Sequence, residues 1–424
     1  MRRITQQTKM AAPMIGVEVG KFVHIKSRFN SENELVSEEP YPRSGHCCAT
    51  DGINLFAFGG YHPEYCKKTK RKGHIVIRRH EVFREMWCFN LAKETWHEVS
   101  MAGDVPHETA SMSMLLSGHT LLLFGGTCYP WGQTSNADVI CFNLKEKRWS
   151  ALTCEGQQPP GKYGHAMSLQ HNRLFLFGGC RQVSEEDFLF DADLHSLDLR
   201  NLTWSLLSNM EDQNDAEAPS RVMYRHGLAW HENKLYIIGN SWKELYSMSI
   251  YQSEVHVYDL ETNSWGKERT LPCPQNGHPN RRQYHSCVQW KNVNIVLYRL
   301  MFAFEEVYIC GGLYNMVIFG DLWKLELPSL QWSLLPTQMP VPTFFHSAAI
   351  TSTKCMYVFG GTTSPGDGKR TNNVFRIWLA LPPLTDIALR KVLSLLPDRS
   401  KESIASLQDL GIPKNIMDRL KHVE

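Results

Sequence analysis

The sequence lacks an excess of charge of either sign. Lys and Arg together number 45 and Asp and Glu number 43, which leaves a formal net charge of +2 over 424 residues. Proteins that bind nucleic acid normally carry a marked basic excess. The balance therefore argues against a dedicated nucleic-acid binder, and we expect no nucleic-acid partner.

Long apolar runs are also missing. A helix that crosses a membrane needs about 18 or more consecutive, mostly apolar residues. No run of that kind occurs here, and the mean hydropathy of the chain is −0.33. We therefore expect no membrane association.

Cysteine pairs with the spacing of redox or zinc motifs are absent. The 12 cysteines are scattered along the chain and no Cys-x-x-Cys occurs. Disulfides persist in oxidising compartments and are rare in cytosolic and nuclear proteins. Because scattered cysteines in a chain of this length favour reduced thiols, we expect a protein of the cytoplasm or the nucleus.

What the sequence does contain is a repeat. Short strand-like runs end in a glycine pair, or in one case in Gly239-Asn240, and they span residues 54–60, 121–126, 174–179, 235–240, 307–312 and 356–361. The mean period is about 60 residues. Most units continue with a second strand and then a tryptophan, at Trp96, Trp149, Trp204, Trp265 and Trp332.

This repeat predicts an all-β fold, a six-bladed β-propeller. A four-stranded sheet cannot bury both of its faces alone, so such sheets pack radially around a channel. Glycine pairs suit a crowded strand end that needs positive φ, and a tryptophan supplies a large buried area between blades. We expect these residues to build the fold and to carry no chemistry.

We divide the chain into three parts. Residues 1–21 are expected to be disordered, residues 22–381 to form the propeller and residues 382–424 to form a helical tail. Within the propeller, residues 22–29 alternate as a strand does. We expect them to pair with the last blade and close the ring, which removes two open sheet edges.

Two insertions interrupt the repeat. Residues 67–80 contain seven Lys or Arg and no acid, which is typical of a solvated loop or of a nuclear-import or nucleic-acid patch. Residues 293–304 are largely apolar and have no place in a blade. We interpret them as an added segment against blade five or as an artefact of the gene prediction.

A short polar and aromatic stretch, which we call the lead-in segment, precedes the first strand of each unit. These segments are residues 43–46, 108–111, 162–165, 224–226, 282–285 and 344–346. Equivalent loops of a propeller converge on one end of the channel. The six segments therefore predict a composite binding pocket at that end.

Beyond Pro383 the apolar period changes from two to 3.6 residues, which predicts helices. The first begins at Leu384 and ends before Pro397, a second covers residues 400–410 and a third follows residue 412. The first helix has an apolar stripe of Leu384, Ile387, Ala388, Val392, Leu395 and Leu396. Helices this short are marginal alone, so the stripe must be covered by the propeller or by a partner's groove.

The tail and the blades resemble a known family. Leu384, Ala388 and Val392 have the spacing of a BC box, and Leu396-Pro397 resembles the start of a cullin-2 box, although residues 398–400 fit it loosely. The blades contribute similar stretches at residues 43–46, 110–113, 284–288 and 320–325. From about residue 42 to 420 the chain resembles the kelch-repeat substrate receptors of cullin-2 ubiquitin ligases.

The resemblance implies a kelch propeller that acts as a non-catalytic substrate receptor and needs no cofactor. Its implied partners are elongin C, elongin B and cullin-2. Leu384, Ala388 and Val392 would contact elongin, and Leu396 and Pro397 would contact cullin-2. Receptors of this family capture substrate proteins by their extreme C-termini, which typically end in glycine.

Such capture requires a pocket that pairs a free carboxylate. Arginine suits this role because its planar guanidinium binds a carboxylate bidentately. The lead-in segments offer Arg43, Arg225 and Arg282, with Arg181 outside them. The pocket walls are expected from Ser44, Tyr163, Tyr224, Tyr284 and Phe345, with Ser111 as a further hydroxyl. For each of these residues the alternative is a purely structural role in its loop.

Two other classes of function stay open. Some kelch-type propellers are copper oxidases, but a copper site needs converging ligands, whereas the histidines here recur at equivalent repeat positions. No complete phosphate-binding loop or nucleophile elbow occurs, so we expect neither an enzyme nor a metal site. The other class is a kelch scaffold for signalling or cytoskeletal proteins, whose tail would not bind elongin.

Overall fold

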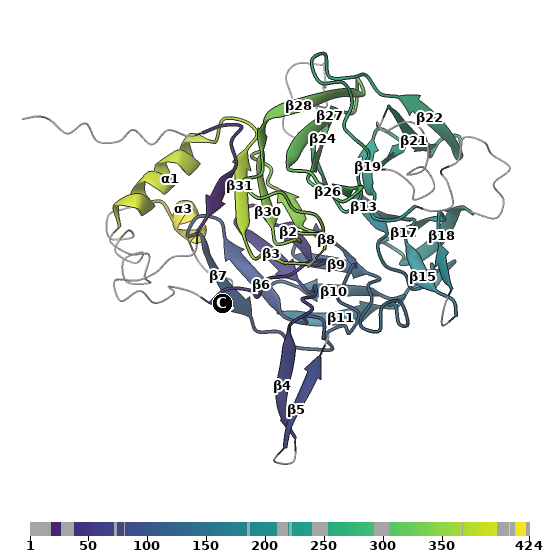
Figure 1. Ribbon diagram of the computed structural model, residues 1–424, viewed down its shortest axis with the longest axis horizontal. Coiled ribbons are helices and arrows are strands. Elements are labelled where there is room, and N and C mark those ends of the chain that lie inside the picture. Colours follow the sequence, from purple (N-terminus) through teal and green to yellow (C-terminus); the bar gives the residue numbers. More distant parts are fainter. Residues whose placement is uncertain are drawn as a thin grey trace, which may run out of the picture.

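The computed structural model shows a ring of β-sheets with a helical tail at its edge (Figure 1). It describes residues 18–26, 38–71, 74–79, 81–184, 187–209, 219, 223–239, 253–291, 305–366, 368–396, 407 and 412–420, with the backbone alone within 66–79. Six main sheets form the ring, so the predicted six-bladed β-propeller is confirmed. The insertion at residues 293–304 lies outside the described residues.

The first three blades each run from an inner to an outer strand in chain order. Blade one contains β2 (Cys47–Thr50), β3 (Asn54–Phe58), β6 (Met86–Asn90) and β7 (Thr95–Val99). Blade two contains β8 (Ser113–Ser117), β9 (Thr120–Phe124), β10 (Val139–Asn143) and β11 (Arg148–Leu152). Blade three contains β13 (Ala166–Gln170), β14 (Arg173–Phe177), β17 (Leu194–Asp198) and β18 (Thr203–Ser208), with β12 (Glu155–Gly156) added outside in parallel.

The next two blades repeat this plan, and the sixth differs. Blade four contains β19 (Gly227–His231), β20 (Lys234–Ile238), β21 (Glu254–Asp259) and β22 (Ser264–Arg269). Blade five contains β23 (Ser286–Lys291), β24 (Glu305–Cys310), β27 (Asp321–Glu326) and β28 (Gln331–Gln338). Blade six contains β29 (Ser347–Ile350), β30 (Cys355–Phe359), β31 (Val374–Trp378) and β1 (Val23–Ile25). The innermost strands of neighbouring blades contact one another all the way around the channel.

The outer strand of blade six comes from the N-terminal segment. β1 runs antiparallel to β31, with Val23 opposite Arg376 and Ile25 opposite Val374. This is the pairing expected from the alternation of residues 22–29, although the strand is shorter than that range and residues 27–29 lie outside the described residues. The first and last parts of the propeller therefore share one sheet, which closes the ring.

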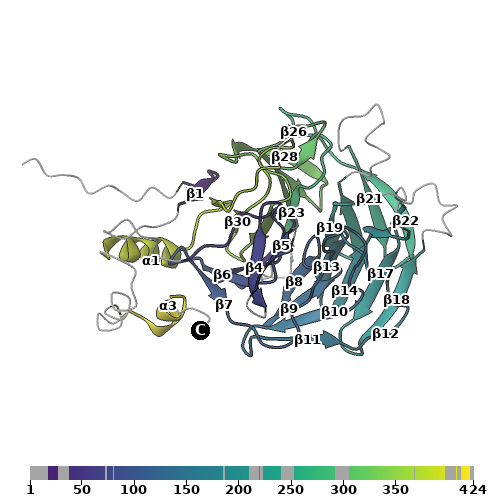
Figure 2. The ribbon, with the colours of Figure 1, turned by 60° about the horizontal axis from the view of Figure 1, so that its bottom comes forward.

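Three short hairpins follow glycine pairs. They are β4 (Cys66–Arg71) with β5 (His74–Arg79), β15 (Cys180–Gln182) with β16 (Phe188–Phe190), and β25 (Leu313–Tyr314) with β26 (Val317–Ile318). The first projects well away from the ring in Figure 1 and points towards the viewer, in front of the ring, in Figure 2. The basic insertion is therefore a two-stranded hairpin and not the loop that its charge predicts. Its β-branched run Ile75-Val76-Ile77 favours the extended backbone.

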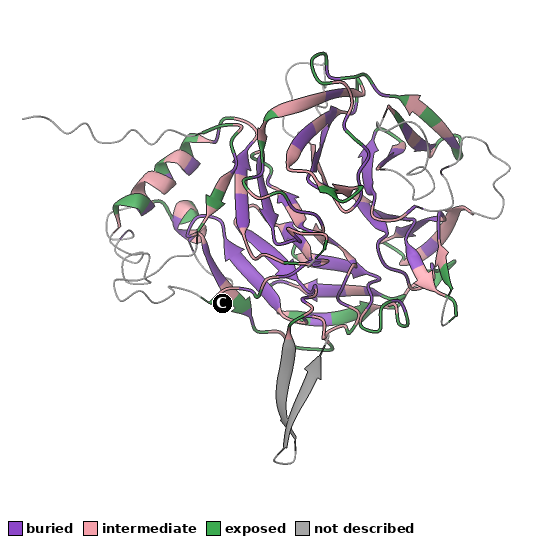
Figure 3. Cartoon of the chain, in the orientation of Figure 1, coloured by how far each residue is buried: buried purple, intermediate pink, exposed green. Residues whose placement is uncertain are grey.

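Buried aromatic contacts join neighbouring blades, and burial is concentrated in the strands (Figure 3). Trp149 of blade two lies against Phe58 of blade one, with ring centroids 4.7 Å apart. Trp96 of blade one lies 4.9 Å from Phe359 of blade six, so the contact continues across the closure. Trp204 and Trp265 lie in the same way against Phe124 and Phe177. These four tryptophans thus cover the residue that precedes the glycine pair of the preceding blade, as their recurrence predicts.

The glycine pairs are required where blades approach one another. Gly59 and Gly125 have φ of 72° and 69°. A Cβ on Gly59 would overlap the carbonyl oxygen of Thr109, and one on Gly125 would overlap that of Lys162. The pair therefore serves both a left-handed backbone and close packing against the next lead-in segment.

The tail packs on the end of the ring away from the glycine pairs. Its helices α1 (Leu384–Leu395) and α3 (Lys414–Asp418) lie beside the β6–β7 turn of blade one. Leu389, Leu393 and Met417 form a small core with Ala92 of that turn. Of the second predicted helix only Leu407 is described, and it is helical and buried in the same core.

Candidate binding sites at the two ends of the propeller

The glycine pairs and the lead-in segments lie at one end of the channel, which we call the mouth. One residue of every lead-in segment has positive φ, between 58° and 69°; these residues are Gly45, Ser111, Gly164, Arg225, Tyr284 and Phe345. Backbone N–H groups join these residues around the axis, for example Ser111 to Gly45 O (2.7 Å) and Arg225 to Gly164 O (2.9 Å). Among the described residues this ring has one gap, between Arg225 and Tyr284.

Bulky side chains are unfavourable at this position of the lead-in segment, because its backbone is left-handed. An L-residue in the left-handed region costs roughly 1–2 kcal/mol relative to the ordinary helical region, and glycine avoids the cost in two of the six blades. Blades four, five and six instead carry Arg225, Tyr284 and Phe345. Strained residues of this kind cluster at functional sites, so these three side chains mark the part of the mouth where function is expected.

Arg225 extends across the mouth. Its Nη2 donates to Ser111 Oγ of blade two, and its guanidinium carbon lies 4.6 Å from the ring centroid of Phe345. It also lies over Tyr224 and Tyr284 at 5.2 and 6.0 Å. Nε is buried without a hydrogen-bond partner, and no described carboxylate forms an ion pair with this arginine. It can therefore accept an anion from outside.

Aromatic rings form a continuous wall around this guanidinium. Tyr163 contacts Tyr224, Tyr224 contacts Tyr284 and Tyr284 lies against Phe345, with centroids 6.0, 6.4 and 4.1 Å apart. Burial raises the pKa of Tyr284 to about 12, so its hydroxyl is neutral at physiological pH. The four predicted wall aromatics thus lie together around Arg225.

Arg43 and Arg282 do not line the pocket in the way the sequence predicts. Both are fully buried. Arg43 donates to Glu85 (2.7 Å) and to Gly59 O (3.0 Å), and Arg282 donates to both oxygens of Asp321 (2.5 and 2.9 Å). Their guanidinium groups are already paired inside the loops. Their geometry therefore assigns them a structural role and leaves Arg225 as the accessible member of the predicted set.

Ser44 accepts a hydrogen bond from Arg370, a residue that the sequence did not identify as part of the pocket. Arg370, in the loop before β31, donates from Nε to Ser44 Oγ (3.1 Å) and lies 5.4 Å from the ring of Tyr61. Trp131 of blade two contacts Tyr61 edge-on at 4.6 Å. Arg370, Tyr61 and Trp131 each lie in a loop that follows a glycine pair, and that shared position is the signal by which the sequence could have identified them.

The lead-in histidines are structural. His46, His165, His226, His285 and His346 are deeply placed in the ring, and Met112 has the equivalent position in blade two. Burial lowers the pKa of His46, His226 and His285 to about 3 and that of His346 to about 4. Within the described part of the chain, no group of three or more His, Cys, Asp or Glu side chains could hold a metal ion.

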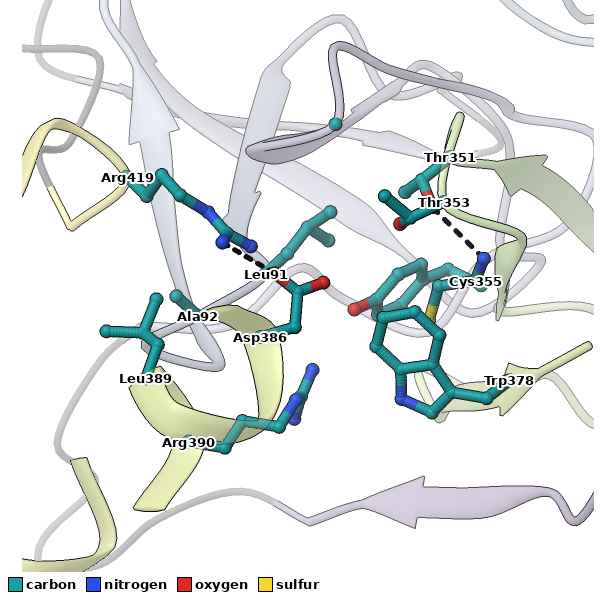
Figure 4. Close-up of a pocket in the computed structure, with 12 residues that line it drawn as sticks. Leu91, Ala92, Thr351, Thr353, Cys355, Trp378, Asp386, Leu389, Arg390 and Arg419 are labelled. Carbon is teal, nitrogen blue, oxygen red and sulfur yellow. Dashed lines mark hydrogen bonds and ion pairs between the residues drawn. The ribbon is translucent and has the colours of Figure 1, made fainter. Parts of the chain in front are cut away.

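The other end of the ring presents α1. Asp386 of this helix pairs with Arg419 (2.5 Å), and Arg390 pairs with Glu94 of blade one (2.9 Å). Figure 4 shows Asp386, Arg390 and Arg419 beside residues of blades one and six. Together with Leu389 and Leu393 they fix which face of the helix meets the propeller.

The exposed side of α1 carries large apolar residues. Leu384 and Leu395 are 82% and 71% exposed, and Ala388 between them is exposed too. The predicted stripe is therefore divided: Val392 and Leu396 are half-buried at its edge, while Leu389 and Leu393 make the buried contact. Pro397 lies outside the described residues.

The cysteines of the described part are free thiols, and burial raises the pKa of several of them, to about 12 for Cys47 and Cys287. No described helix is both long and apolar enough to cross a membrane.

The glycine pairs, the lead-in segments and the interblade tryptophans define a kelch-repeat β-propeller. A family model described as "KLHDC2/KLHL20/DRC7 Kelch-repeats domain" matches residues 22–239 and 73–298. Kelch domain-containing protein 10 of Rattus norvegicus is 38% identical over 407 residues, covering 95% of this chain and 91% of that protein.

Proteins with this or a closely related name from other animals are similar to this chain as well. Kelch domain-containing protein 10 of Homo sapiens is 38% identical over 402 residues, covering 94% of this chain and 83% of that protein. The kelch domain-containing protein 10 homolog of Drosophila melanogaster is 27% identical over 439 residues, covering 98% and 67%. The chain belongs to the kelch domain-containing protein 10 family.

Proposed function

We propose that this chain is the substrate-recognition subunit of a cullin-2–elongin B/C ubiquitin ligase, and that it captures substrates by glycine-ended C-termini at the mouth. The observation that carries the proposal is the exposed apolar stripe of α1, presented by a helix that is already docked through its opposite face. In this role the chain is a non-catalytic receptor that acts in the cytoplasm or the nucleus.

The adaptor end is supported by the division of α1 into two faces. Large exposed apolar side chains such as Leu384 and Leu395 cost free energy in water and commonly mark an interaction surface. They share one side of the helix with Ala388, whose small side chain lets a partner helix approach closely. This fits the leucine and small-residue spacing of a BC box and helix-in-groove binding.

The substrate end is supported by the environment of Arg225. A terminal carboxylate would pair with its guanidinium, with Ser111 Oγ as a neighbouring hydroxyl. Aromatic rings lower the local dielectric and strengthen that pair. A glycine at the last position carries no side chain to collide with Tyr224, Tyr284 and Phe345, which crowd the guanidinium.

The test is co-elution of the purified chain with elongin B/C on a size-exclusion column. Wild type should co-elute, and Leu384→Lys should not, because a buried lysine would replace the apolar anchor. Leu381→Lys is the matched control, since Leu381 is 84% exposed and lies just before the helix. Equal co-elution of Leu384→Lys and wild type contradicts the proposal and favours a kelch scaffold that does not recruit a ligase.

A further inference from the structure

Arg370 resembles Arg225 and differs from Arg43, Lys162 and Arg282, because no described acid pairs with it. Its Nε donates to Ser44 Oγ (3.1 Å), its Nη1 donates to Gly368 O, and its guanidinium lies over the ring of Tyr61. Among the described residues no carboxylate forms an ion pair with it. Burial lowers the pKa of Arg370, which reflects partial loss of water around the charge.

Three buried cations of the lead-in segments each have a described acidic partner, unlike Arg370. Arg43 pairs with Glu85, Lys162 with Asp191 and Arg282 with Asp321. A charge that has lost part of its water without gaining a counter-charge is unfavourable. Among the residues that the structure describes, an acid pairs with each of these three lead-in cations and none pairs with Arg370. This guanidinium is therefore suited to an anion that arrives with a ligand.

Backbone pairing holds the groups around Arg370 in place. Ser44 and Tyr61 exchange two backbone hydrogen bonds (3.1 and 2.9 Å), and Arg370 forms an antiparallel bridge with Thr362 of its own β30–β31 loop. Trp131 packs edge-on against Tyr61 and is 37% exposed. The cluster therefore has a fixed hydroxyl, a fixed cation and an aromatic side that stays open to solvent.

This cluster and Arg225 belong to the same mouth. Gly45 follows Ser44 directly and donates to the carbonyl oxygen of Phe345 (3.2 Å). The ring of Phe345 lies 4.6 Å from the guanidinium of Arg225. One extended peptide whose terminus lies at Arg225 can therefore pass Arg370 within a few residues, since a strand advances about 3.3 Å per residue.

We propose that Arg370, Ser44, Tyr61 and Trp131 form a second anion subsite, which binds the side-chain carboxylate of an Asp or Glu a few residues upstream of the captured C-terminus. The inference rests on the proposed function. It adds to it a substrate class: C-terminal peptides that carry an acid at a fixed distance from the terminal glycine.

The test is fluorescence anisotropy with the full chain and labelled ten-residue peptides that end in Gly-Gly. A single Glu is placed at each of positions three to eight from the C-terminus, and each peptide has a Gln partner. One position should bind about tenfold more tightly with Glu than with Gln, the gain expected of a charge-assisted pair. That preference should vanish in Arg370→Gln and persist in the neighbouring control Lys369→Gln.

The outcomes separate this inference from the proposed function. If no free-acid peptide binds wild type, the proposed function fails. If the peptides bind but Glu gives no gain at any position, or if Arg370→Gln keeps the gain, the second subsite is wrong. If Arg370→Gln abolishes binding of the Gln peptides too while its melting temperature is unchanged, Arg370 holds the terminal carboxylate and the subsite as stated is overturned.

Discussion

At the scale of single residues, the propeller uses arginine in two ways. Arg43 and Arg282 lie three residues before a lead-in histidine and pair with Glu85 and Asp321 further along the same blade, whereas Arg225 directly precedes His226 and extends into the mouth. The equivalent backbone position is glycine in blades one and three. The side chain of Arg225 is therefore retained at a conformational cost that the fold itself does not require.

Arg225→Gly, which copies blades one and three, tests that interpretation. Relief of a left-handed residue is worth roughly 1–2 kcal/mol and offsets the lost aromatic contacts, so the melting temperature should not fall. Peptide affinity should fall at least tenfold, because the carboxylate loses its charge-assisted bonds. Calorimetric titration with a Gly-Gly-ended peptide and a thermal melt check both parts, and unchanged affinity would contradict the role of Arg225.

The sequence identified Arg225 as a candidate carboxylate-binding residue, but it could not show that Arg225 is accessible while Arg43 and Arg282 are buried. All three share a residue type and a lead-in segment, and accessibility depends on Glu85 and Asp321, which lie about 40 residues further along the chain. Arg370 was missed because its partner Ser44 is at the other end of the sequence. Contacts made by ring closure cannot be derived from local spacing.

At the scale of elements, the N-terminal strand and the C-terminal helices complete the packing of the propeller. β1 is short, yet it completes blade six, and Phe22 beside it is buried in the core of blades five and six. In the tail, the 3.6-residue period correctly located α1, but it did not identify the docked face. Ion pairs with Arg419 and Glu94, together with Leu389 and Leu393, set the docked face. Of the predicted stripe, Leu384, Ala388 and Leu395 are left exposed, while Ile387, Val392 and Leu396 are half-buried.

Deletion of residues 1–30 should lower the melting temperature by several degrees or more. The variant loses the outer strand of blade six and leaves a core position open, and a buried aromatic alone is worth about 3–5 kcal/mol. Deletion of residues 1–17, which are predicted to be disordered, is the control. Equal melting temperatures for the two variants would show that β1 does not close the ring.

At the scale of the whole molecule, the repeat buries neutral histidines around the channel. Their folded pKa values lie below the value near 6.5 of an unfolded chain. Between about pH 6.5 and 4 the unfolded chain therefore binds more protons, and stability decreases as the pH falls. Each histidine contributes up to about 1.4 kcal/mol per pH unit over that window.

His46→Met copies Met112 of blade two and removes one such group. Denaturant unfolding at pH 7.0, 6.0 and 5.0 should give a free energy of unfolding that falls less steeply with acid than in wild type, by about one proton. His119→Met, which replaces an exposed histidine of the β8–β9 turn, is the control for the His-to-Met exchange itself. An unchanged slope in His46→Met would contradict the account of these histidines.

The overall architecture followed from the sequence because it repeats. Six recurrences of one pattern outweigh any single ambiguous motif, and the interblade tryptophans gave independent support. The basic insertion was predicted as a loop because its charge dominated the interpretation, whereas β-branched residues within it form a strand. Function is harder to predict from the sequence, because it depends on which side chains stay exposed and unpaired once the ring has closed.

The central claim is that one end of the ring captures a C-terminus while the other recruits an adaptor. The most direct measurement is a ternary capture, in which an immobilised Gly-Gly-ended peptide is incubated with the purified chain and elongin B/C. The account predicts that the free-acid peptide retains both, that Leu384→Lys is retained without elongin, and that the C-terminally amidated peptide retains neither. Equal retention on the amidated peptide, or elongin retained with Leu384→Lys, would contradict it.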